Sequence, residues 1–247
     1  RTTYIGRCPM LFLYNPGGVI GIEKHNRTSL FVTRTFLDLH QCATNNTSVP
    51  LHYKPKRITM ATYQTEPMLQ ELEVDVKEAI RLVEQEFKPL TKEQLNWVPA
   101  PGKWSINDCL EHLNIYSRYY QPRIRKQVEQ GGTQPKSTFT AGYFGEMMMV
   151  MKPLPDGTIR KPMSTMGSYN PTKQTTKNDK ALQEFLGHLN DLLDLLKKAR
   201  KVNLEKHKIT STLGPILRFK LGDNYRFHIA HIQRHLLQAH NVFVLLK

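Results

Sequence analysis

Residues 227–240 of the 247-residue chain read Phe-His-Ile-Ala-His-Ile-Gln-Arg-His-Leu-Leu-Gln-Ala-His. Apolar residues recur here at steps of three and four, which is typical of an amphipathic helix. At about 100° per residue, His228, His231 and His235 fall within about 60° of one another, inside the apolar face. Burying an unpaired polar group costs about 1–3 kcal/mol, so three imidazoles on one stripe need a common explanation. The flanking Arg226, Gln233 and Arg234, and His240 further along, are expected to face solvent.

Metal binding is one such explanation. Residues four apart on a helix lie about 6 Å apart with side chains leaning the same way, so His231 and His235 can bind one divalent ion. His228 and His231 form a second possible pair, whereas His228 and His235 lie too far apart along the axis. The competing interpretation is that these are hydrogen-bonded core histidines.

A third ligand has to come from another helix, and His112 is the leading candidate. It lies on the same side of its expected helix as Cys109, Tyr116 and Tyr119. Three neutral imidazoles leave coordination positions open, which is typical of catalytic metal sites. Zinc, nickel and iron(II) all suit imidazole nitrogen. The inward Cys109 is interpreted as core filler.

Three further long helices are expected upstream. Apolar steps of three and four run from residue 66 to 87, and Ser105 with Asp108 resembles a capping box that starts a helix ending near Gln130. A leucine-rich stripe predicts another helix over 176–202, and the last helix is expected from about Phe219 or Gly222 to the C-terminus. A short helix is expected over 91–98.

Four long helices with one long connection, over residues 131–175, predict an all-α four-helix bundle in which a crossover joins the second and third helices. Residues 60–247 contain no run with the two-residue period of a strand. Part of the long connection, with the basic Arg160 and Lys161, is a candidate lid that could meet an acidic substrate.

Residues 1–59 differ from the rest, because their apolar runs are short and no helical period persists. We expect an irregular, poorly ordered leader that does not belong to the native protein, with Met60 as its natural first residue. A transit-like segment and a small extra subdomain are the alternatives. Residues 60–247 are expected to form the folded domain.

Composition excludes several classes of protein. No window approaches 18 consecutive apolar residues, which excludes a membrane-spanning helix, and three scattered cysteines exclude a disulfide scaffold. The net charge of +14 is spread over the chain without a focused basic patch, so nucleic-acid binding is disfavoured.

Two segments resemble the DinB/YfiT-like family of metal-binding four-helix bundles. One is residues 102–113, Gly-Lys-Trp-Ser-Ile-Asn-Asp-Cys-Leu-Glu-His-Leu, and the other is residues 231–238, His-Ile-Gln-Arg-His-Leu-Leu-Gln. The resemblance spans about residues 66–247. It implies that His112, His231 and His235 hold a divalent ion, most often zinc or nickel, with water in the open position.

Relatives in this family include thiol S-transferases and hydrolase-like members. The resemblance therefore implies a cytoplasmic bacterial metalloprotein that acts on a small electrophilic substrate, with a low-molecular-weight thiol as one candidate co-substrate and a homodimer as a candidate assembly. Four side chains are expected to support the metal ligands by holding their second ring nitrogens; these are Tyr116, Tyr119, His228 and Gln238. A non-catalytic stress-response module with a structural metal is the alternative.

Overall fold

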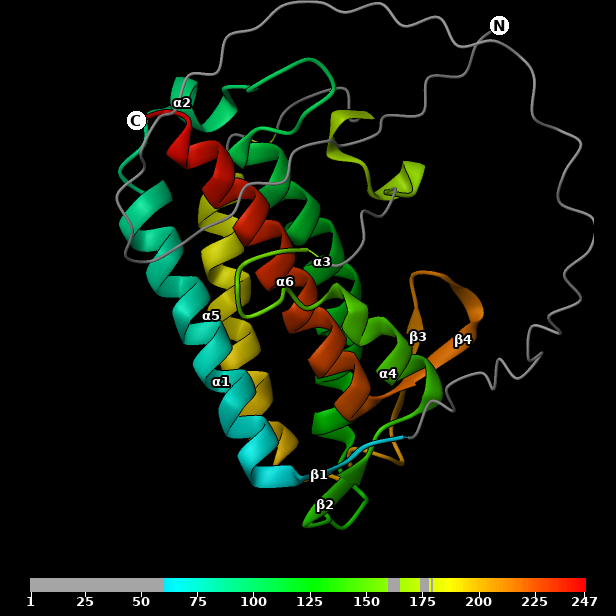
Figure 1. The fold of residues 1–247 in the computed structure, drawn as a ribbon. Helices are drawn as coiled ribbons and strands as arrows, with labels where there is room; N and C mark the ends of the chain where they lie inside the picture. The colour runs from blue at the N-terminus through cyan, green and yellow to red at the C-terminus, as the bar shows by residue number, and fades with distance from the viewer. Residues whose placement is uncertain (1–59, 160–164, 174–177, 179) are drawn as a thin grey trace, which may run out of the picture. The chain divides into compact units, whose positions relative to one another are not determined.

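Four long helices dominate the structure, a computed structural model that describes residues 60–159, 165–173, 178 and 180–247. The expected leader, residues 1–59, and the basic pair Arg160 and Lys161 lie outside the described residues. The predicted all-α bundle is confirmed (Figure 1). Its helices are α1 (Thr65–Leu82), α3 (Ile106–Gln130), α5 (Ala181–Ala199) and α6 (Leu221–Val244). None of the described helices combines the length and apolar character that a membrane span requires.

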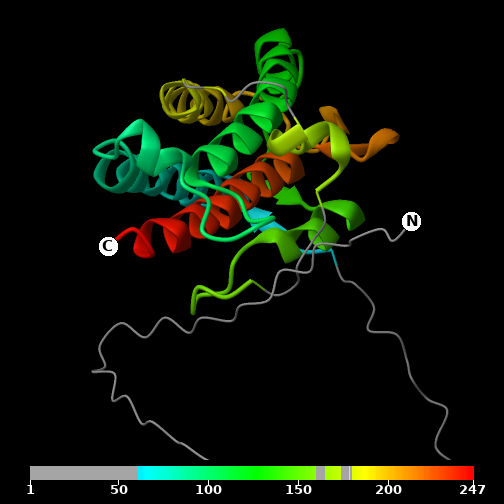
Figure 2. The same cartoon turned by 90° about the horizontal axis from the view of Figure 1, so that it is seen from above.

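The directions of the helices follow from the contacts between them. Helices α3 and α5 run parallel: Asn114 donates to the carbonyl of Ala181 near the start of α5, and Lys198 near its end donates to Glu129. Helices α3 and α6 run antiparallel, since His112 contacts His231 and the later Tyr120 contacts the earlier Phe227. Both views show α3 and α6 side by side (Figures 1 and 2). Because α3 and α5 point the same way, the chain has to travel back along the bundle between them.

Local signals account for where the first half of the bundle starts and stops. Buried apolar residues follow α1 at helical spacing and continue into a π-helical turn, η1 (Val83–Phe87). Thr91 caps the short helix α2 (Lys92–Asn96) with a complete capping box. The second capping box, between Ser105 and Asp108, starts α3. This helix continues through Pro122 to Gln130.

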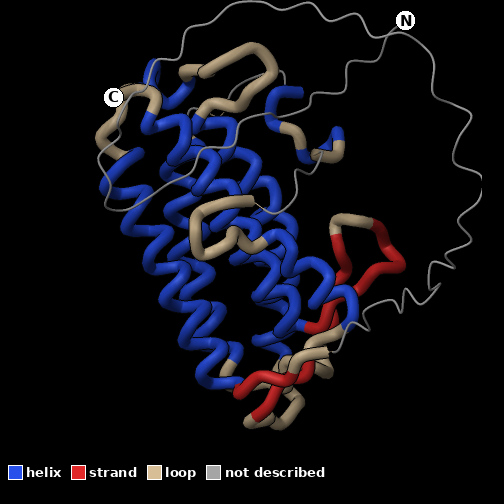
Figure 3. Tube along the Cα trace, in the orientation of Figure 1, coloured by secondary structure: helices blue, strands red, loops and turns tan. Residues whose placement is uncertain are grey.

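Two small sheets correct the expectation that residues 60–247 contain no strands (Figure 3). Strand β1 (Thr62–Gln64) pairs antiparallel with β2 (Thr138–Thr140), and β3 (Lys208–Ser211) pairs with β4 (Gly214–Lys220). Most of these strands are too short to show an alternating pattern. The last helix begins at Leu221, within its expected range, whereas α5 begins at Ala181, later than expected.

The flank of α6 that was expected to face solvent is covered. Arg226 and Arg234 are both buried. The short helix α4 (Tyr143–Met148) packs on α6 and brings Glu146 to Arg226, with Nη1 2.7 Å from Oε1. The second guanidinium nitrogen donates to the hydroxyl of Tyr63 on β1. A helical period cannot reveal this cover, because it comes from segments outside the four-helix pattern.

Candidate metal centre

Three histidines from two antiparallel helices meet in the core of the bundle. One ring nitrogen from each of His112, His231 and His235 lies within 4.8 Å of the others. The Nε2 atoms of His112 and His231 are 3.2 Å apart, and the His235 ring centre is 4.4 Å from that of His112. His112 comes from α3 and the other two come from α6, one helical turn apart. The structure thus brings together the three ligands that the sequence resemblance implies.

Hydrogen bonds at the far side of two rings orient them. The Nδ1 of His112 lies 2.7 Å from the carbonyl oxygen of Tyr169, in the short turn η3 (Gly167–Tyr169). The Nδ1 of His235 lies 3.1 Å from the amide oxygen of Gln238. Because both oxygens can only accept, each Nδ1 carries the proton and each Nε2 keeps its lone pair. This is the arrangement in which an imidazole can bind a metal.

Burial keeps the three rings neutral. It lowers the pKa of His112 to about 4, against the opposing effect of the Tyr169 carbonyl. The pKa values of His231 and His235 also fall well below the usual value, because of burial first and neighbouring imidazoles second. All three side chains can therefore donate a lone pair at neutral pH.

The spacing of the rings suits a shared cation. A lone pair on the Nε2 of His112 faces the Nε2 of His231 at 3.2 Å, so the two lone pairs repel unless a proton or an ion lies between them. Two nitrogens bound to one tetrahedral zinc at 2.0–2.1 Å lie about 3.3 Å apart. The residues present therefore fit a divalent ion.

Aromatic rings surround the cluster. Trp104 stacks on His235 with centres 5.7 Å apart and also contacts His112. Tyr116 lies against His231 at 4.3 Å, and Phe227 stacks on the same ring at 5.8 Å. These rings bury the cluster, and electrostatic interactions are stronger in a buried, less polar environment. His235 is the most exposed of the three histidines at 8%.

Neither of the acidic residues nearest in sequence joins the cluster. Glu111 binds Arg118 and Asn178, and Glu146 binds Arg226. Among the described residues, the one group with metal-ligand geometry contains histidines alone. An all-imidazole set favours zinc, nickel, copper or iron over magnesium or calcium.

The supporting residues expected from the sequence take different positions. Gln238 holds His235, as described, and Tyr116 contacts the cluster through its ring. Tyr119 turns away, because its hydroxyl lies 3.4 Å from the carbonyl of Ser211 and its ring lies under Arg123. His228 is fully buried, and both of its nitrogens lack a hydrogen-bond partner among the described residues.

Sequence reasoning missed two contacts with the cluster. The Tyr169 carbonyl carries no side-chain signal, and it belongs to a connection without helical periodicity. Trp104 stands in the segment that carried the family resemblance, but its contact with two histidines was not anticipated. The contact could have been predicted from the position of Trp104 directly before Ser105, the cap of α3, because this position places the indole beside the first turns of that helix.

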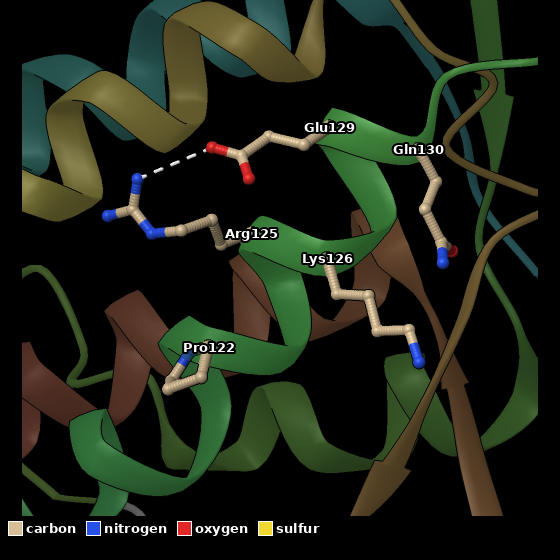
Figure 4. A pocket seen from close by; sticks show the side chains of 5 residues that line it. All are labelled: Pro122, Arg125, Lys126, Glu129 and Gln130. Atoms are coloured by element: carbon tan, nitrogen blue, oxygen red, sulfur yellow. Dashed lines mark ion pairs between the residues drawn. The ribbon is translucent and has the colours of Figure 1, made fainter.

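A surface hollow of about 490 Å³ lies elsewhere on α3 (Figure 4). Its lining residues all belong to that helix, and Arg125 pairs there with Glu129 at 3.6 Å. The lining is Pro122, Arg125, Lys126, Glu129 and Gln130. No residue of the histidine cluster borders it, so it offers no route to the cluster.

His228 makes the stability of the bundle sensitive to acid. Burial lowers its pKa from 6.5 to about 3, with His188 contributing in the same direction. A lowered pKa means that its contribution is complete above pH 6.5 and is lost as the pH falls towards 3. We expect the melting temperature in chelator to fall between pH 6.5 and 4, and His228→Phe to flatten that fall. Ile232→Val should lower stability equally at every pH; an unchanged slope in His228→Phe would contradict the assignment.

A sequence model described as the DinB superfamily matches residues 76–239, which is 164 of the 247 residues. The chain belongs to the DinB superfamily. The matched part of this DinB superfamily chain contains all three histidines of the cluster.

One solved structure was also found to be similar. It is described as "YfiT from Bacillus subtilis is a probable metal-dependent hydrolase with an unusual four-helix bundle topology". It is 14% identical, with a TM-score of 0.44, and the alignment covers 78% of this chain and 93% of that one. The comparison with curated proteins returned no match.

Proposed function

We propose that the chain is a metal-dependent enzyme that holds a divalent ion, zinc or nickel, on His112, His231 and His235. The observation that supports this most directly is the convergence of three neutral imidazoles without a carboxylate. The substrate is a small electrophilic molecule, and the reaction is either its hydrolysis or the transfer of a thiol to it. A cytoplasmic location, a bacterial source and a homodimer stay predictions.

A divalent ion bound there would supply Lewis acidity, which lowers the pKa of a water or thiol and makes it a nucleophile at neutral pH. Residues of the chain orient the histidine rings and cover them. The Tyr169 carbonyl and Gln238 hold two rings in one tautomer, and the aromatic rings of Trp104 and Tyr116 pack against the cluster and limit its exposure. Because His235 is the most exposed ligand, we infer that the substrate approaches from its side.

A structural metal in a non-catalytic module is the second candidate. It is favoured by the burial of the cluster, since His112 and His231 are each only 2% exposed. A structural ion would stabilise the fold without turnover.

The two candidates separate in one experiment on the metal-loaded chain. We expect turnover of an activated ester, or of a haloalkyl bimane with a low-molecular-weight thiol, that falls to background with chelator and in His235→Gln. The matched control is His240→Gln, which removes a histidine of the same helix outside the cluster and should keep full activity. Turnover that persists in chelator would refute metal activation, and a melting temperature that collapses without any turnover would favour the structural metal.

A further inference from the structure

A second cleft, of about 200 Å³, lies between α1 and α6. It is lined by Met68, Leu72 and Asp75 from α1, by Ile229 and Gln233 from α6, and by neighbouring residues of β1 and the turn η2 (Met149–Met151). On α6, Gln233 and Ile229 point away from His231 and His235 by more than about 90° of helix rotation. The cleft is therefore separate from the histidine cluster.

The floor of this cleft is apolar. Met68, Leu72 and Ile229 are nearly completely buried beneath it, and Met149 forms part of one side. A hydrocarbon group that enters the cleft is stabilised because its own apolar surface leaves water, at about 25 cal/mol for each Å². The volume accommodates a short alkyl chain rather than a ligand of drug size.

One end of the cleft offers hydrogen-bond acceptors. The Gln233 amide donates to the half-buried carboxylate of Asp75, and burial raises the pKa of that carboxyl above its usual value. The Gln233 amide oxygen is buried and has no partner among the described residues. An acceptor of this kind is costly unless a donor reaches it. Lys152 approaches Asp75 only to 3.8 Å and lies closer to Glu71, at 3.2 Å.

The positive charge at the other end is already neutralised. Arg226 pairs with Glu146 at 2.7 Å, lies 3.6 Å from Asp223 and donates to Tyr63. Two carboxylates thus surround one guanidinium, so Arg226 has little capacity to attract an anion. Among the described residues, the ammonium of Lys152 is the one cationic group paired with Asp75 and Glu71. The four charged side chains that line the cleft balance one another, and Glu146 and Asp223 behind Arg226 add two further carboxylates, so the surroundings of the cleft are acidic in a chain whose net charge is +14.

We propose that this cleft binds a small primary amine, with its ammonium between the Asp75 carboxylate and the Gln233 amide oxygen and its alkyl group on Met68, Leu72 and Ile229. An ammonium has three donors, which can satisfy both acceptors at once. Two oxygens are too few for a dedicated calcium or magnesium site, which takes six or more ligands.

Titration of the full chain with n-hexylammonium tests this proposal, with n-hexanol and hexanoate as probes of equal chain length. Methyl resonances of labelled methionine report the location: we expect Met68 and Met149 to shift, and the exposed Met147 to stay unchanged. Asp75→Asn should weaken hexylammonium binding about tenfold or more, because a hydrogen bond to a charged group is lost. The matched control Asp191→Asn, at an exposed position of α5, should leave it unchanged.

Lys152→Met provides a second test that does not alter a buried group. It removes the competing ammonium, so we expect hexylammonium to bind several-fold more tightly. Binding should also be equal in His235→Gln and in wild type, which keeps this proposal independent of the metal site. Tighter binding of hexanoate than hexylammonium would overturn the proposal. So would hexylammonium affinities in both Asp75→Asn and Lys152→Met that stay within twofold of wild type.

Discussion

Replacing His231 with alanine is expected to abolish metal binding. His231 packs against both other histidines of the cluster and is only 2% exposed, so no water can replace its nitrogen without reorganising the core. Loss of an outer hydrogen-bond partner of a ligand typically costs 10–100-fold in metal affinity, and loss of the ligand itself should cost more than about 100-fold. Elemental analysis after dialysis against trace metal should fall from near one ion per chain to background.

Graded variants make this result specific. Gln238→Ala removes the oxygen that holds the Nδ1 of His235 and should weaken binding by about 10–100-fold. His240→Ala removes an imidazole from the same helix, where it contacts Glu86 outside the cluster, and should keep full occupancy. Equal metal content in His231→Ala, Gln238→Ala and wild type would remove the ligand assignment.

Replacing Arg226 with methionine is expected to destabilise the fold by about 3–5 kcal/mol, because it leaves charged groups buried without a partner. Arg226 is 7% exposed and serves both Glu146 and Asp223. The paired carboxylate of Asp223 is 1% exposed and also accepts from the Gly142 amide. Chemical denaturation of the variant and wild type measures the difference, with Arg125→Met at a partly exposed position of α3 as control.

This loss should also depend on pH. Burial raises the pKa of Asp223 to about 6, and Arg226 is one of the groups that limits the rise. Without Arg226 the pKa should rise further, so the folded state would hold the proton more tightly than the unfolded state. A raised carboxyl pKa lowers stability as the pH rises through it. Arg226→Met should thus lose more stability at pH 8 than at pH 5, and an equal loss at both values would argue against this role.

Local sequence signals predicted much of the scaffold and its histidines. The start of α3 was predictable because Ser105 and Asp108 satisfy each other within one turn, and the spacing of His231 and His235 follows from a single helix. Burial of Arg226 was not predictable, because α4 covers it from 80 residues away in sequence. The pairing of β1 with β2 likewise joins residues such as Thr62 and Thr140, which no local period connects.

The position of the Tyr169 carbonyl illustrates a second kind of gap. The acceptor at the Nδ1 of His112 is a backbone carbonyl, which every residue type has. The identity of residue 169 therefore conveys nothing about the bond. Only the path of the chain between α3 and α5 determines it. Side-chain chemistry is therefore readable from sequence more easily than backbone chemistry.

His112 and His231 are 119 positions apart, on helices that meet only when the last one docks. During synthesis, a nascent polypeptide that ends before residue 231 presents a single imidazole of the trio. If the cluster binds an ion as proposed, uptake is consequently a late event in biogenesis, because a product that ends before residue 231 lacks two of the three proposed ligands.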